Sequence, residues 1–300
     1  MRIAPAYLLG GEIAIKDFHC TYDNASGINA EAVARANVVF PDVHNDARMM
    51  ADLSKALKKH YNAPFCTLPF CHTVEAEALG GIVNLGNAET GPRCGGYIAS
   101  SVEEILDLPD MNFSEGRIAK VLEAIRMLAD EGEHVLVEIC GPITIMNSLI
   151  DPKHIFKMMR KDKEMTKAVF EKLGEQAFHY MQQAKEHGAR LISYADVVGG
   201  VNIVGPKLAE EIVDLFTYGY VKRIQELSDE NCLMMLCPKT TFALLGTDKA
   251  KFRDIELEEP MRYGEACIEM IGKAKLAGMT CCHNMEFTLN NAIFKEVVLI

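Results

Sequence analysis

Apolar residues occur along this chain in two patterns: short continuous runs, and longer segments in which they recur at helical spacing. A continuous apolar run predicts a strand buried on both faces, and helical spacing predicts an amphipathic helix. The predicted strands are residues 63–68, 134–139, 190–195 and 232–237. The predicted helices are residues 46–61, 117–130, 162–187 and 206–227. Strands that alternate with helices in this way predict parallel β-α units.

The C-terminal part of the chain continues this alternation. It predicts helices at residues 240–245 and 262–277, and strands at residues 252–257, 279–282 and 296–300. Further upstream, Ser101 followed by Glu104 fits a capping box and predicts a short helix.

The sequence carries no glycine-rich dinucleotide motif and no phosphate-binding loop after a predicted strand. This favours a closed barrel over an open doubly wound sheet. We therefore predict an α/β fold of the (β/α)8 TIM type. It forms a single domain over residues 1–300, with residues 1–45 as an N-terminal helical extension.

Composition narrows the classes of function. The formal net charge of −11 argues against a nucleic-acid partner, which usually needs a basic face. Apolar runs stay shorter than the roughly 18 to 20 residues that cross a bilayer, and the N-terminus lacks the core of an export signal. Ten dispersed cysteines in such a chain predict reduced thiols. We expect a cytoplasmic protein without a membrane or nucleic-acid partner.

Residues that can bind metal or move protons follow several predicted strands. Because the carboxyl ends of barrel strands share one rim, these side chains are expected to lie close together. Their thiol, imidazole and carboxylate groups are the ligands that zinc takes in catalytic sites. The residues at the strand ends are Glu138, Cys140, Asp196, Cys237, Cys281, Cys282 and His283.

Other roles remain open for several of these residues. Cys140 can be a packing residue, and Asp196 can cap the turn at residues 197–200. In a regular strand, Cys281 and Cys282 point to opposite sides, so only one can be a ligand, and Cys282 is preferred. His283 is then a ligand or supports one.

The chain resembles the uroporphyrinogen decarboxylase superfamily, and within it the corrinoid-dependent methyltransferases related to methylcobamide:coenzyme M methyltransferases. The first stretch that carries this likeness is residues 69–80, PFCHTVEAEALG, with Gly91-Pro92-Arg93 shortly after it. The second is residues 138–144, EICGPIT, continuing to residues 149–152. The third is Cys237 together with the late cysteine cluster.

The resemblance implies a (β/α)8 barrel that holds zinc through a His-x-Cys pair and a distant cysteine. Cys237 matches the first cysteine, and Cys282 or Cys281 matches the late one. Met235 stands at the histidine position, so His283, Glu138 or Asp196 completes the site, or the site binds no metal. The stretch from Cys237 to the late cysteines is also short for the family, as if a β-α unit were trimmed.

The function that the resemblance implies is methyl transfer between a small methylated compound and a corrinoid carried by a separate protein. The compound is a methyl ether, a methylamine or a thiol, and the absent histidine tilts the expectation towards an ether. Candidate catalytic residues are Asp196, Glu138 and His72, while Glu75 and Glu77 are expected on an exposed helix face. The alternatives are a metal-free lyase that uses Asp196, and a non-catalytic barrel that binds a corrinoid protein.

Overall fold

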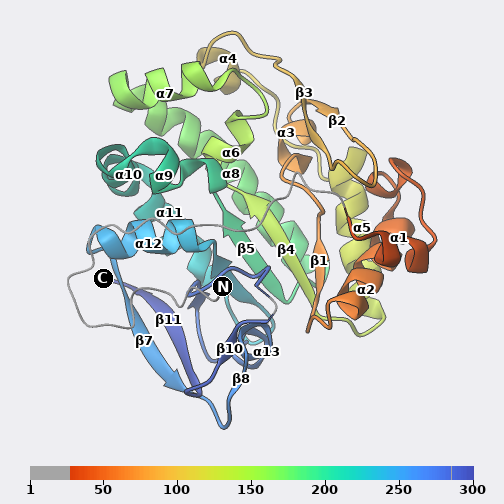
Figure 1. Cartoon of the computed structure of the whole chain (residues 1–300). Coiled ribbons are helices and arrows are strands. Elements are labelled where there is room, and N and C mark those ends of the chain that lie inside the picture. Colours follow the sequence, from red (N-terminus) through yellow and green to blue (C-terminus); the bar gives the residue numbers. More distant parts are fainter. Residues whose placement is uncertain (1–27, 285) are drawn as a thin grey trace.

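The computed structural model describes residues 28–284 and 286–300. Its centre is a five-stranded parallel sheet in the order β1-β4-β5-β6-β9 (Figure 1). The strands are β1 (Cys66–Leu68), β4 (Val135–Cys140), β5 (Leu191–Ala195), β6 (Leu233–Leu236) and β9 (Leu276–Ala277). Every residue of β4, β5, β6 and β9 is buried, as continuous apolar runs predict.

The strand register places matching side chains in rows across the sheet. Leu136, Leu191 and Leu233 form one row, and Glu138, Ser193, Met235 and Ala277 form the next. Because alternate residues of a strand share a face, both rows lie on the same side of the sheet. This inner face packs against the C-terminal part of the chain through Tyr263 and Phe294. Glu138 is thus a carboxylate on the inner face.

Helices that follow or precede the strands cover the opposite face and form the larger core. In Figure 1, α8 lies behind the central strands, with α1, α2 and α5 to one side near β1. The helices of this part are α1 (Ala30–Ala36), α2 (Ala47–His60), α3 (Val74–Ala78), α4 (Glu103–Leu106), α5 (Gly116–Asp130), α6 (Pro142–Met146), α7 (Pro152–Lys161) and α8 (Lys163–Glu186). A short hairpin of β2 (Ile82–Asn84) and β3 (Arg93–Gly96) follows α3.

Local signals explain several helix boundaries. Asp46 and Asp162 cap α2 and α8 by accepting a backbone N–H three residues later. The predicted capping box is displaced by one residue, because Glu104 accepts from Ser100 rather than Ser101. The predicted helix over residues 206–227 is one continuous element with varying pitch. It consists of α10 (Pro206–Ile212), a π-helical segment (Val213–Thr217), α11 (Tyr218–Ile224) and a 3₁₀ turn (Gln225–Leu227).

The segment after β6 departs from a regular series of β-α units. After α12 (Pro238–Gly246), β7 (Ala250–Glu256) pairs antiparallel with β11 (Ile293–Leu299), outside the parallel sheet. β8 (Met261–Arg262) pairs in the same sense with β10 (Thr288–Leu289), and α13 (Tyr263–Glu269) lies between β8 and β9. In Figure 1, β7, β8, β10, β11 and α13 lie in the lower part of the molecule, below the central strands. Among the described residues, β1 and β9 are the two ends of the sheet and do not pair with each other.

Two C-terminal predictions are corrected here. The helix predicted over residues 262–277 ends at Glu269, and the strand predicted over residues 279–282 is wrong. The strand is β9, at residues 276–277, and Met279 to Cys282 lie in the turn beyond it. Apolar character could not separate the two interpretations, because a buried strand end and a buried turn are equally rich in small apolar residues.

The predicted N-terminal extension is described from residue 28 onward. There α1 packs against α2, and a 3₁₀ turn (Asp42–His44) leads into α2. Residues 1–27 lie outside the described part of the chain. Within the described part, no helix combines the length and apolarity needed to cross a membrane.

Candidate metal centre

Glu138 is the point at which three distant parts of the chain meet. It lies on the inner face of β4 and is only 8% exposed. His72 Nε2, from the loop before α3, contacts its Oε1 atom. His283 Nε2, from the turn after β9, lies 3.1 Å from its Oε2 atom. The Cys282 thiol also donates to Oε2, at 3.6 Å.

This cluster has the composition of a metal site. One ligand atom each from Glu138, Cys282 and His283 lies within 4.8 Å of the others. Carboxylate oxygen, thiolate sulfur and imidazole nitrogen are the ligands that zinc takes, and three protein ligands leave a position open for a substrate. The residues present therefore fit zinc. His72 contacts the other oxygen of the same carboxylate, Oε1. Residues around a metal ligand commonly orient that ligand in this way.

Burial and charge act against each other at this cluster. Burial alone would raise the pKa of Glu138, but His72 and His283 outweigh it and hold that pKa well below the ordinary value. Burial likewise tends to lower the pKa of each histidine, and the Glu138 carboxylate reverses the direction and raises both. The carboxylate thus stabilises the protonated form of each imidazole, and each imidazole stabilises the carboxylate.

The two adjacent cysteines act as a pair. The interaction between their thiols lowers the pKa of Cys281 to about 7 and, together with burial, raises that of Cys282 well above its ordinary value. The alternation that was expected to point them to opposite sides is wrong, because they lie in a turn and not in a strand. Both thiols are thus available at one place.

Cys237 and Met235 lie on the same side of the sheet as this pair. Cys237 follows β6, and a thiolate there would add to the effects of Cys281 and of burial in raising the pKa of Cys282. Met235 is buried in the apolar cluster that covers the inner face of the sheet, here called the inner cluster, which also contains Cys282. The Met235 thioether stands where the resemblance places a histidine, and it is not among the ligands that zinc usually takes.

Glu75 is a buried group that the sequence did not reveal as such. It was expected on an exposed helix face, but it is 0% exposed, so that expectation is wrong. Its Oε1 atom accepts from the Cys140 backbone N–H at 2.7 Å, whereas its Oε2 atom is buried and has no hydrogen-bond partner in the described part of the chain. Burial raises the pKa of Glu75, against the effect of that N–H. A five-residue helix has too few positions to show which face is buried.

Asp196 occupies a separate place. Its carboxylate accepts from the backbone N–H groups of Ile143 and Thr144, at 3.2 and 2.8 Å, and from the Thr144 hydroxyl at 2.8 Å. It therefore caps the start of α6, not the turn after β5. Burial raises its pKa, and these three hydrogen bonds act in the opposite direction.

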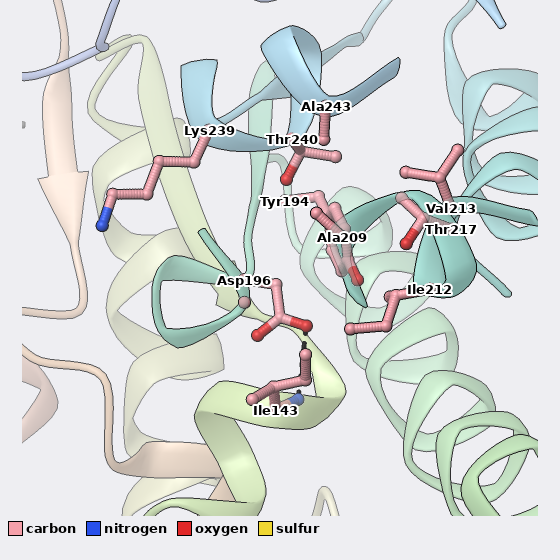
Figure 2. Close-up of a pocket in the computed structure, with 11 residues that line it drawn as sticks. Ile143, Tyr194, Asp196, Ala209, Ile212, Val213, Thr217, Lys239, Thr240 and Ala243 are labelled. Carbon is pink, nitrogen blue, oxygen red and sulfur yellow. Dashed lines mark hydrogen bonds between the residues drawn. The ribbon is translucent and has the colours of Figure 1, made fainter. Parts of the chain in front are cut away.

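A small cavity adjoins Asp196 on the helix-covered side of the sheet (Figure 2). Its volume of about 30 Å³ is room for about one water molecule. Its walls are mostly apolar and include Tyr194 and Ile212. Lys239 extends away from Asp196 and donates to the Val197 carbonyl oxygen at 3.1 Å (Figure 2). This cavity has room for little more than a water molecule, and the catalytic role predicted for Asp196 stays a prediction.

The parallel sheet and this cluster define an α/β protein with a candidate metal centre at the carboxyl ends of its strands. Residues 26–278 match the uroporphyrinogen decarboxylase (URO-D) family, and the chain belongs to that family.

Two named relatives are methylcobamide:CoM methyltransferases. MtaA of Methanosarcina barkeri (strain Fusaro) is 25% identical over 258 residues, which make up 83% of this chain and 73% of MtaA. MtbA of Methanosarcina acetivorans is 23% identical over 232 residues, or 76% of this chain and 68% of MtbA. A solved methyltransferase from Methanosarcina mazei superposes with a TM-score of 0.62 at 20% identity, covering 73% of this chain and 67% of that one. This likeness confirms the predicted fold class.

Proposed function

We propose that this protein is a zinc-dependent methyltransferase that moves a methyl group between a small methylated compound and a corrinoid carried by a partner protein. The observation that carries the proposal is the convergence of Glu138, Cys282 and His283 within 4.8 Å. The relatives named as methylcobamide:CoM methyltransferases support the reaction class.

The proposed ligands are Cys282, His283 and Glu138, with Cys237 and Cys281 as the neighbouring thiols. Zinc, when bound, supplies a Lewis acid that can hold a thiol as its thiolate or polarise the oxygen of a methyl ether. Met235 leaves β6 without the histidine ligand that the resemblance implies. Glu138 of β4 supplies a ligand in its place.

The chain's own residues contribute position and charge. Glu138 fixes the orientation of two imidazoles through its two oxygen atoms. His72 contacts Glu138 beside the proposed ligands, so it is the candidate to give a proton to a leaving group and take it back. Burial of the cluster limits the access of water, so its charges interact more strongly than they would in solvent.

Metal content is the first test of this proposal. We expect about one zinc per chain in the wild type. We expect metal loss together with a roughly 100-fold or greater loss of methyl transfer in Cys282→Ser and His283→Asn, because each variant removes one proposed ligand. Elemental analysis gives the first quantity, and the absorption change of methylcobalamin on reaction with a thiol gives the second.

The matched control is Cys267→Ser. Cys267 is a buried thiol of the same inner cluster, close to Tyr263. Its replacement should leave zinc and methyl transfer unchanged. Wild-type protein that holds no zinc after preparation without chelators would contradict the metal site. Zinc-loaded protein that transfers no methyl group to or from any cobalamin would contradict the reaction.

A further inference from the structure

The segment that carries His72 is anchored on both sides of that residue by one buried guanidinium. Arg117 is the second residue of α5, and its side chain is only 2% exposed. Its Nη1 atom donates to Cys71 Sγ at 3.1 Å, and its Nη2 atom donates to Thr73 Oγ1 at 2.9 Å. Its Nε atom donates to the Glu77 carboxylate. The residues immediately before and after His72 are therefore both bound to Arg117.

The intervening residues face the candidate metal centre. His72 contacts Glu138, and Glu75 accepts from the backbone N–H of Cys140 at the end of β4. One side of the segment is thus fixed to α5 and the other to β4. A hydrogen bond between Cys71 Sγ and Thr73 Oγ1, at 3.3 Å, ties the two flanking side chains to each other.

The arrangement uses a property that is particular to arginine. A guanidinium presents several N–H donors in a rigid plane, so three acceptors bound to it are fixed relative to one another. A lysine ammonium at this position would keep the charge without keeping that plane. A buried cation also costs free energy, and apolar packing would serve stability alone at least as well. The donor geometry therefore points to orientation of the segment.

We propose that Arg117 is a positioning residue that holds His72 against Glu138 and so sets the geometry of the candidate metal centre. The catalytic consequence of this role rests on the proposed function. The structural consequence does not, because the contact between His72 and Glu138 can be observed directly.

A double-mutant cycle tests the catalytic consequence. Arg117→Lys should lower kcat/KM for methyl transfer about 10-fold or more, as His72→Asn does, with the larger part in kcat. In the His72→Asn background, Arg117→Lys should cause no further loss. Additive losses in the double variant would overturn the proposal, because they would show that Arg117 acts independently of His72.

A crystal structure of Arg117→Lys tests the structural consequence. We expect the His72 ring to have left Glu138, with β4 and the turn of Cys282 and His283 unchanged. Retention of the His72–Glu138 contact in this variant would overturn the proposal. If the wild type transfers no methyl group, the proposed function fails, and this crystallographic outcome still decides the role of Arg117.

Two further variants separate positioning from stability. Thr73→Val removes a single anchor and leaves Arg117 bound to Glu77 and Cys71, so it should fold and lower kcat/KM in the same direction. Arg262→Lys is the matched control, because Arg262 binds Glu265 and the Asn62 carbonyl oxygen without touching the His72 segment. It should reduce stability and leave kcat/KM unchanged. Unaltered kcat/KM in Thr73→Val and Arg117→Lys alike would overturn the proposal.

Discussion

At the scale of single residues, buried polar and charged side chains determine the geometry of the candidate site and the pH dependence of stability. Glu138 brings together two histidines and a thiol, and Arg117 binds the residues on each side of one of those histidines. A third such residue is His44, which lies in the turn before α2. It is 3% exposed and packs edge-on against Phe40 and Phe70, and its Nε2 atom has no hydrogen-bond partner among residues 28–284 and 286–300.

His44 should make the stability of the protein depend on pH. Its burial, and then the nearby Arg117 charge, lower its pKa to about 4 from an ordinary 6.5. Between these two values the unfolded chain binds the proton and the folded chain does not. The contribution of His44 is therefore present above pH 6.5 and is lost as the pH falls towards 4. We expect the titration of His44 to lower the free energy of unfolding by about 3 kcal/mol between pH 7 and pH 4.

Urea unfolding at both pH values checks this prediction. In His44→Leu the fall in unfolding free energy between pH 7 and pH 4 should be smaller by that amount. Phe70→Leu is the control, since it removes a ring that packs on His44 without removing a titrating group. It should lower stability equally at both pH values. An unchanged pH dependence in His44→Leu would contradict the assignment.

At the scale of elements, α8 packs closely against the π-helical segment because Gly174 leaves room for the rings of Phe216 and Tyr220. Gly174 in α8 faces the π-helical segment, and a Cβ atom there would lie 2.7 Å from Phe216 Cζ and 3.1 Å from Tyr220 Cε2. The Tyr220 hydroxyl donates to the Gly174 carbonyl oxygen at 2.9 Å. The wider turn of the π-helical segment carries Phe216, whose ring stacks on Tyr220 at 4.9 Å between centroids.

Two glycine-to-alanine substitutions should therefore have opposite effects. Gly174→Ala should destabilise the protein by about 1–3 kcal/mol, because the added methyl overpacks the contact with Phe216. Gly219→Ala in α11, where no atom lies within 4 Å of the added Cβ, should stabilise by about 0.5–1 kcal/mol. Thermal unfolding of the two variants measures the difference. Equal shifts of Tm in the same direction would show that helix propensity alone decides.

At the scale of the whole molecule, the C-terminal segment closes the inner face of the parallel sheet. Phe294 of β11 is fully buried and stacks on Tyr263 of α13, with ring centroids 5.9 Å apart. Both rings belong to the cluster that contains Leu136, Leu191 and Leu233 of the sheet. Antiparallel β7 and β11 and helix α13 thus cover a face that a regular series of β-α units would close on itself.

This arrangement predicts that the ring of Phe294 contributes strongly to the packing of the C-terminal segment against the core. Phe294→Ala should lower the unfolding free energy by about 3–5 kcal/mol, through lost burial and the cavity left behind. Far-UV circular dichroism and tyrosine fluorescence should report the same urea midpoint, because sheet and C-terminal segment share one core. Phe252→Ala, in the partly buried part of β7, is the control and should cost less. Separate midpoints for the two signals would contradict a shared core.

The sequence by itself determined the parallel strands β1, β4, β5 and β6 and the long helices, whereas it misplaced the last parallel strand, β9. The reason for the success is that apolar periodicity and caps such as Asp46 and Asp162 act locally. It could not show that residues 250–256 pair with residues 293–299, since a β pairing depends on where distant strands meet.

Only the tertiary structure decided which polar residues form the candidate site. Glu138 and His283 are 145 positions apart, and no spacing in the sequence joins them. Asp196 had the same position after a strand as Cys237, yet its carboxylate binds the start of α6 because the neighbouring helix offers unpaired N–H groups. Glu75 and Arg117 are polar residues on amphipathic helices in the sequence, and only packing shows that both are buried. Burial and charge pairing arise from the assembled fold, so they could not be predicted from local pattern.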